Sequence, residues 1–165
     1  MAHRKLENWL QSYREYTAES EAPDQYHLWV GLSVLSAVVR RNISYRRNYS
    51  IIYPNLYVML VSPPGEARKG DAMELGKALL EGVPSVRIEA NKLTIEALIN
   101  SLSGGVYSIK PSRKRNAPPP VYQQVTIQQT CAGIIYSEEF SVTMGADCLQ
   151  SGLLDALTQF FDCPV

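Results

Sequence analysis

The chain has 165 residues, of which 45% are hydrophobic, and its 16 lysines and arginines balance its 16 aspartates and glutamates. This length and composition are typical of one globular domain with its own core, and they exclude a chain that is disordered throughout. The zero formal charge gives no support to a whole-protein attraction to nucleic acid. Only local basic patches remain candidates for such binding.

Cysteine and histidine content narrows the class further. The three cysteines are widely spaced, without a CxxC pair, and the chain has two histidines. This excludes a histidine-rich metal site and favours a reducing compartment. The N-terminus lacks the apolar core of a signal peptide, and the apolar run 28–39 is too short to span a bilayer. We therefore expect a cytoplasmic protein without a membrane partner.

Residues 1–48 are predicted to form an N-terminal helical segment. An apolar stripe at helical spacing predicts a first helix over residues 6–16. The stripe consists of Leu6, Trp9, Leu10, Tyr13 and Tyr16. A second helix is expected from about Asp24 to Arg40, and because it is apolar nearly all round it should be buried. His27, near its start, is interpreted as a structural residue.

The segment Leu56–Gly70 has the order strand, tight loop, helix. The apolar run Leu56–Val61 predicts a strand, Ser62-Pro63-Pro64-Gly65 predicts a turn, and Lys69 opens a helical pattern that extends to Glu81. Nucleotide-binding proteins use this order to present backbone N–H groups and one ammonium to a triphosphate. The residues expected to contact the nucleotide are Pro64, Gly65, Glu66, Ala67, Arg68, Lys69, Gly70 and Asp71.

Two positions in this loop depart from the usual pattern. Arg68 stands where a glycine precedes the lysine, and Gly70 stands where Ser or Thr follows it. Gly70 offers no hydroxyl to Mg²⁺, so Asp71 or water would have to substitute. The alternative interpretation is an ordinary turn followed by a solvated lysine on the first turn of a helix.

A second candidate group lies at the end of a predicted strand over residues 132–136. Glu138 and Glu139 follow it, and carboxylates in this place hold Mg²⁺ and orient an attacking water in phosphoryl-transfer enzymes. Glu138 would hold the metal through a water, and Glu139 would be the general base. The alternative is that both residues form the acidic first turn of a helix, where the helix dipole favours them.

The remaining pattern predicts an α/β fold with a mostly parallel, P-loop NTPase-like sheet in residues 49–165. Its further elements are a strand at 86–88, a helix at 95–102 that Thr94 caps, a strand at 106–109, an exposed loop at 110–120, a strand at 121–130 and a helix at 152–161. These strands are fewer than an open nucleotide-binding sheet usually has. We therefore expect this core to be incomplete at its C-terminal end.

Three basic stretches invite a nucleic-acid interpretation: Arg40–Arg41, Arg46–Arg47, and Lys110 with Arg113–Arg115. Arg46 and Arg47 lie among tyrosines in the β-prone stretch 43–53, where aromatic rings would stack on bases. For this stretch we favour the alternative, a solvated charged surface whose tyrosines pack inward. Arg113, Lys114 and Arg115 lie in the loop at 110–120 and are the better candidates to contact a DNA strand.

Over residues 20–165 the chain resembles the P-loop ATPase domains of phage and prophage primase-helicase-like replication proteins. Six segments in order carry the resemblance: Pro23 to Arg41, Tyr53–Val61, the variant phosphate loop Ser62–Gly70, Lys92–Leu98, Ile135–Val142 and Leu153–Pro164. The resemblance implies ATP and Mg²⁺ as cofactors and a helicase-like ATPase in DNA replication.

The resemblance also implies roles for single residues. Lys69 would contact the β- and γ-phosphates, the loop from Gly65 to Arg68 would wrap them, and Glu138 and Glu139 would take the metal and water roles. Motors of this kind usually assemble as rings in which a neighbouring subunit supplies an arginine. A non-catalytic nucleotide-binding or scaffold module, and a nucleic-acid-binding protein with a degenerate loop, remain the alternative functions.

Overall fold

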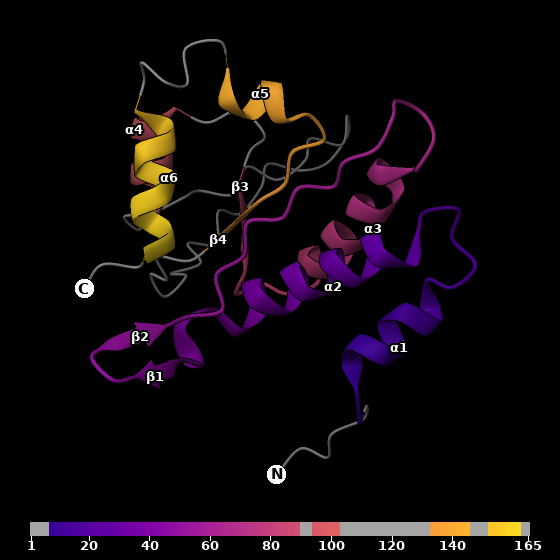
Figure 1. Ribbon diagram of the computed structural model, residues 1–165, viewed down its shortest axis with the longest axis horizontal. Coiled ribbons are helices and arrows are strands. Elements are labelled where there is room, and N and C mark those ends of the chain that lie inside the picture. Colours follow the sequence, from indigo (N-terminus) through magenta and orange to yellow (C-terminus); the bar gives the residue numbers. More distant parts are fainter. Residues whose placement is uncertain (1–6, 90–93, 103–132, 146–151, 163–165) are drawn as a thin grey trace, which may run out of the picture.

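The computed structural model describes residues 7–89, 94–102, 133–145 and 152–162. Its helices are α1 (Trp9–Tyr16), α2 (Asp24–Val39), the 3₁₀ helix η1 (Arg40–Asn42), α3 (Lys69–Glu81), α4 (Ile95–Leu102), α5 (Phe140–Met144) and α6 (Leu153–Asp162). Its strands are β1 (Tyr45–Arg47), β2 (Ser50–Ile52), β3 (Arg87–Glu89) and β4 (Gly133–Ile135). The predicted mixture of helices and strands is confirmed (Figure 1).

Helix α1 begins at its cap. The Asn8 side chain accepts a hydrogen bond from the N–H of Gln11 at 3.2 Å, which satisfies one of the free donors at the helix start. Tyr13 is buried, as the apolar stripe predicts. Tyr16 is 75% exposed, so its assignment to the buried stripe is wrong.

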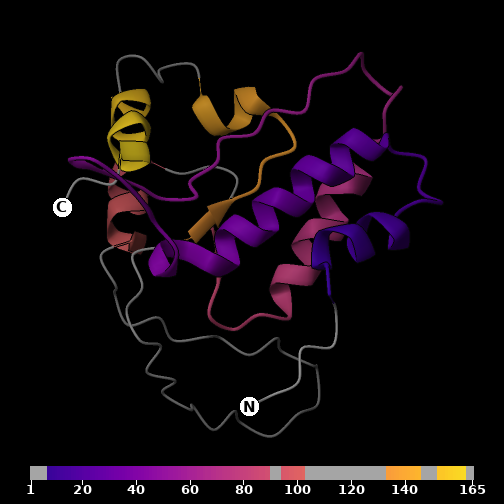
Figure 2. The ribbon, with the colours of Figure 1, turned by 60° about the horizontal axis from the view of Figure 1, so that its bottom comes forward.

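Helix α2 is buried on one face only. Its buried residues are His27, Val30, Gly31 and Val34. Trp29 is 46% exposed and Val38 37% exposed, so the prediction of a helix buried all round is wrong. Among the described residues, α1 and α3 pack against α2 (Figures 1 and 2), and the remaining surface of α2 is only partly covered. The prediction that His27 is structural agrees with its burial at 1% exposure.

Helix α3 has the predicted bounds and packs along α2. The small core at this contact consists of Ala22, Val30 and Ala72, with Leu60 and Met73 against it. Two glycines let the helices approach. A Cβ added at Gly76 would meet the Val30 side chain, and one added at Gly31 would lie 2.9 Å from both Leu10 Cδ1 and Tyr13 Cδ1.

The predicted parallel pairing is confirmed for two strands. Strand β3 pairs with β4 in parallel, with Ile88 opposite Ile134, so segments far apart in the chain meet in one sheet. The other sheet is the antiparallel hairpin β1–β2. Each of these sheets has two strands. The larger, mostly parallel sheet of a P-loop core is not seen in the described residues and stays a prediction.

The predicted strand Leu56–Val61 is wrong for the described structure. Residues 53–63 are extended but join no sheet there, and Leu56, Tyr57 and Met59 are 42%, 61% and 61% exposed. Side chains hold the segment instead. On one side Tyr26 Oη donates to Val61 O at 2.7 Å and Ser36 Oγ donates to Pro54 O.

On the other side the extended segment meets α6. Asn55 Nδ2 donates to Phe161 O at 2.7 Å and Tyr57 Oη donates to Leu157 O at 2.5 Å, while the rings of Tyr57 and Phe161 lie 5.3 Å apart. The segment thus connects α2 to α6. The donors of these hydrogen bonds are side chains. The apolar, strand-forming pattern of residues 56–61 does not predict such bonds.

The hairpin β1–β2 corrects another prediction. All six of its strand residues are exposed, and Tyr45 and Tyr49 are 68% and 106% exposed. The prediction that tyrosines of this stretch pack inward is therefore wrong for these two residues. The hairpin extends beyond the C-terminal end of α2 (Figure 1), where no described element covers it.

Two further helices agree with prediction. Thr94 Oγ1 accepts from the N–H of Ala97 at 3.2 Å and caps α4, and α6 begins and ends one residue after its predicted bounds. The predicted elements at 106–109, 110–120 and 121–130, with Arg113, Lys114 and Arg115, lie outside the described residues. No helix in the described part is long and apolar enough to cross a membrane.

Candidate phosphate-binding loop

The predicted phosphate loop is a turn that leads directly into α3. Gly65 has a φ of +78° and Arg68 a φ of +43°, so the backbone enters the left-handed region on both sides of Glu66 and Ala67. Glycine adopts this region at little cost, whereas arginine rarely does. The loop therefore bends sharply and turns the chain into the helix at Lys69.

The start of α3 presents backbone donors. The first helical hydrogen bond of the turn runs from the N–H of Ala72 to Arg68 O at 3.4 Å. Arg68 provides no side-chain cap, and the N–H groups of Lys69, Gly70 and Asp71 make no hydrogen bond within the described structure. An uncapped helix start of this kind carries partial positive charge and binds anions.

The two cations of the loop differ in what they contact. Arg68 Nε lies 2.8 Å from Glu21 Oε2, in an exposed ion pair with the connection between α1 and α2. Lys69 is half-buried and forms no ion pair with another described residue. Lys69 is therefore the available cation at the helix start, while Glu21 competes for Arg68 with any bound anion.

Gly70 stands in open space. A Cβ added there meets no atom within 4 Å. Packing therefore does not require the glycine that replaces the usual Ser or Thr. A serine side chain fits at this position without displacing a neighbour.

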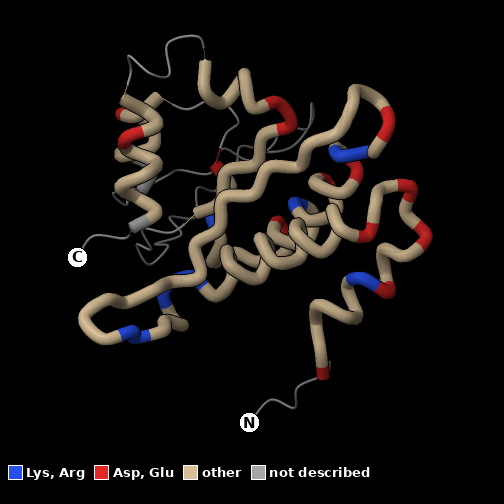
Figure 3. Tube along the Cα trace, in the orientation of Figure 1, with Lys and Arg blue, Asp and Glu red and all other residues tan. Residues whose placement is uncertain are grey.

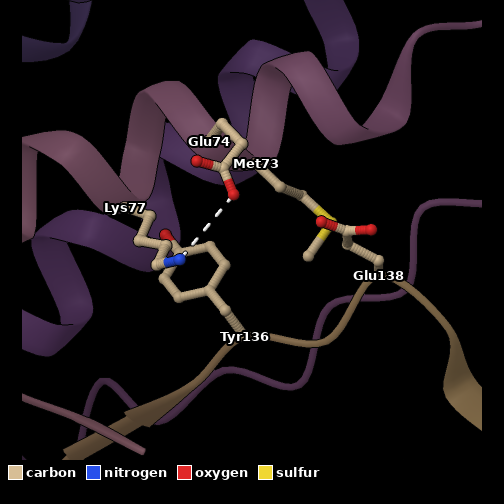
Figure 4. A pocket seen from close by; sticks show the side chains of 5 residues that line it. All are labelled: Met73, Glu74, Lys77, Tyr136 and Glu138. Atoms are coloured by element: carbon tan, nitrogen blue, oxygen red, sulfur yellow. Dashed lines mark ion pairs between the residues drawn. The ribbon is translucent and has the colours of Figure 1, made fainter. Parts of the chain in front are cut away.

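The two candidate carboxylates follow β4, with Glu138 at a bend of the chain and Glu139 directly before α5. Glu138 borders a small pocket of about 30 Å³ together with Met73, Glu74, Lys77 and Tyr136 (Figure 4). Glu139 is the residue before α5, and its backbone oxygen accepts from Ser137 Oγ at 2.8 Å. Parallel pairing with β3 thus brings Glu138 to the side of α3.

The phosphate loop and Glu138 both lie along α3, but they do not line the same pocket. Glu138 meets α3 between Met73 and Lys77, whereas Lys69 is one turn earlier on the same helix. Lys77, whose Nζ lies 3.7 Å from Glu74 Oε1, is the cation nearest to the pocket. Sequence reasoning missed Glu74 and Lys77, although their spacing of three on a predicted helix indicates a pair on one surface.

Tyr136 was also missed. Its hydroxyl is buried without a hydrogen-bond partner in the described structure, and burial raises its pKa to about 12. The same oxygen would lie 2.9 Å from a Cβ at Gly76. Its place at the end of a predicted strand, directly before Ser137 and Glu138, is the feature of the sequence that could have indicated it.

Whether these residues can hold Mg²⁺ depends on how many of its ligands the phosphates of the nucleotide supply. No group of three or more histidine, cysteine, aspartate or glutamate side chains in the described part of the chain could hold a metal. Mg²⁺ in phosphoryl-transfer sites commonly uses one or two protein carboxylates together with phosphate oxygens and water. Glu138 is compatible with that smaller requirement, and Asp71 on the first turn of α3 offers a second carboxylate.

Comparisons with protein-family models, with curated proteins and with solved structures give no match to this chain.

Proposed function

We propose that this protein binds ATP through the loop Pro64–Asp71. The observation that supports the proposal is the start of α3, where three N–H groups follow a left-handed loop and, like the Lys69 side chain, have no partner among the described residues. Backbone donors, a helix dipole and one cation are the combination that stabilises a polyphosphate.

Each part of the loop has a distinct role in this proposal. The N–H groups of Lys69, Gly70 and Asp71 donate to phosphate oxygens, and the Lys69 ammonium neutralises the β- and γ-phosphates. Arg68 adds a second positive charge when it leaves Glu21. Asp71 or water would hold Mg²⁺ in place of the missing hydroxyl at residue 70, and the ion would supply further positive charge to the phosphates.

Hydrolysis is the further step of the proposal. Glu138 would hold the metal through a water, and Glu139 would accept a proton from the water that attacks the γ-phosphorus, with ADP as the leaving group. The resemblance over residues 20–165 is what leads us to propose that the site serves a cytoplasmic, helicase-like DNA replication protein of the phage type, with a ring as the assembly that the full-length protein would form. A non-catalytic nucleotide-binding module is favoured if Glu138 stays at its pocket beside Met73 and Lys77 when ATP is bound.

Calorimetric titration of ATP, with and without Mg²⁺, tests binding. Wild-type protein is expected to bind, Lys69→Ala to lose most of the affinity, and Lys69→Arg to keep a larger part because the charge is retained. Folded wild-type protein that does not bind ATP would overturn the proposal.

Two further variants test the assigned roles of Arg68 and residue 70, and each is expected to increase a measured quantity. Glu21→Gln releases Arg68 and is expected to tighten ATP binding in low salt. Gly70→Ser restores a hydroxyl in open space and is expected to increase the dependence of affinity on Mg²⁺. If neither variant changes affinity while Lys69→Ala abolishes it, the lysine binds the phosphates without the metal geometry that we propose.

A further inference from the structure

The hairpin β1–β2 is a separate exposed surface that the ATP site does not use. Strand residues 45–47 and 50–52 are exposed on both faces of the sheet. In Figure 1 the hairpin lies at one end of α2, and the start of α3 lies toward the other. A two-stranded sheet that buries neither face contributes little to a core. The hairpin is therefore available to a partner.

The charged residues in and around this hairpin are all basic. From Gln25 to Gly65 the sequence contains no aspartate or glutamate, and its only lysines or arginines are Arg40, Arg41, Arg46 and Arg47. Figure 3 shows this basic colouring at the hairpin and at the C-terminal end of α2, without acidic residues beside it. Arg46 and Arg47 form no ion pair with another described residue. Their charge is therefore left for an anionic partner.

Aromatic rings accompany these charges. The register pairs Tyr45 with Ile52 and Arg47 with Ser50, so Tyr45 and Arg47 share one face of the hairpin and Arg46 lies on the other. The two-residue turn, with Asn48 at a φ of +51°, places Tyr49 at the tip, where it is 106% exposed. The Tyr49 ring thus has both of its faces uncovered by the described residues.

We propose that the hairpin β1–β2 binds single-stranded nucleic acid. Arg46 and Arg47 contact phosphates, and Tyr45 and Tyr49 stack on bases. Exposed rings favour a single strand over a duplex because paired bases keep their faces stacked inside the helix. They also favour nucleic acid over an acidic peptide, which has no bases to stack on them. The proposal uses neither Arg113, Lys114 and Arg115 nor the ATP site.

Fluorescence anisotropy of a labelled oligothymidylate, long enough for one site of up to about 16 nucleotides, tests the proposal. Tyr49→Ala is expected to weaken binding about fivefold or more, and Tyr49→Phe to bind like wild type because it keeps the ring. Neither change removes a contact within the protein, so both variants should fold normally.

The arginines are tested through salt dependence. The double variant Arg46→Gln, Arg47→Gln is expected to lower the slope of log affinity against log salt by about 1.4, since each phosphate contact on a single strand contributes about 0.7. Arg14→Gln on α1 removes one charge far from the hairpin in sequence and is expected to leave the slope unchanged. Circular dichroism confirms that each variant is folded.

Three results would overturn the proposal. The first is equal affinity of wild type, Tyr49→Ala and the double arginine variant. The second is tighter binding of a duplex of the same length than of the single strand. The third is equally tight binding of polyglutamate or of anionic lipid vesicles without any effect of Tyr49→Ala, which would indicate general attraction to polyanions.

Discussion

Gly76 of α3 lies against Val30 of α2, with no room between the two backbones for a side chain at residue 76. A Cβ there would meet Val30 Cγ1 and would lie 2.9 Å from Tyr136 Oη. The glycine thus sets the distance between the two longest described helices. It also sets the place of β4 beside them, because Tyr136 follows β4 directly.

Gly76→Ala is therefore expected to destabilise the fold. Overpacking at a close contact costs roughly 1–3 kcal/mol, which outweighs the gain of about 1 kcal/mol that alanine gives in a helix interior. Gly70→Ala, on the same helix but in open space, is the matched control and should be neutral or stabilising. Urea denaturation measures both changes. Equal stabilisation by the two alanines would show that α2 and α3 are not in close contact at residue 76.

The free energy of unfolding should decrease at acidic pH because of His27. The side chain is 1% exposed, Tyr13 lies edge-on to it at 6.2 Å, and burial lowers its pKa below the usual 6.5 although Asp24 acts in the opposite direction. The unfolded chain then binds a proton near pH 6.5 that the folded chain binds only at lower pH. The contribution of His27 is thus complete above that pH and is lost as pH falls below it.

The urea midpoint, measured between about pH 8 and pH 5, tests this expectation. Wild type should lose stability across the lower part of this range, and His27→Leu should lose less over the same interval. A pH dependence identical in both proteins would assign the acid sensitivity to other groups.

Tyr136 should limit stability on the alkaline side. Its pKa is raised to about 12 by burial, whereas an unfolded tyrosine ionises near 10. The unfolded chain releases this proton first, so stability is lost as pH rises above 10. Tyr136→Phe removes this loss and also removes a buried hydroxyl that has no hydrogen-bond partner among the described residues, so it should keep or raise stability at neutral pH.

Thermal unfolding of Tyr136→Phe at neutral and alkaline pH, with ultraviolet titration of tyrosinate, checks both parts. A loss of about 1 kcal/mol or more at neutral pH would show that the hydroxyl makes a hydrogen bond, for example to a buried water.

The contact between the extended segment and α6 should show energetic coupling. The rings of Tyr57 and Phe161 lie 5.3 Å apart at an interplanar angle of 52°. A double-mutant cycle with Tyr57→Leu and Phe161→Leu is expected to give a coupling of about 0.5–1.5 kcal/mol in the free energy of unfolding. The pair Tyr49→Leu and Phe161→Leu should be additive, because Tyr49 is fully exposed. Additivity in both cycles would contradict the docking of α6 on this segment.

The sequence by itself determined five of the helices, α1, α2, α3, α4 and α6, and the places of two strands. Periodic apolar residues and local caps specified α3 with its exact ends and α4 with its Thr94 cap, because helix hydrogen bonds and caps form between near neighbours in the chain. Apolar runs also located β3 and β4, and the alternation of strands and helices predicted parallel strands, but which strand pairs with which came from the structure. The loop before α3 followed from its prolines and Gly65.

Only the tertiary structure decided which surfaces meet. An apolar run such as Leu56–Val61 suits a strand, but a strand needs a partner, and here its neighbours are side chains of α2 and α6. The strand propensity of tyrosine is the same whether the ring points inward or outward. Tyr45 and Tyr49 are exposed because no described element covers the hairpin. Likewise Glu138 reaches α3 at Met73 and Lys77 because β4 pairs with β3, a long-range contact that local spacing does not encode.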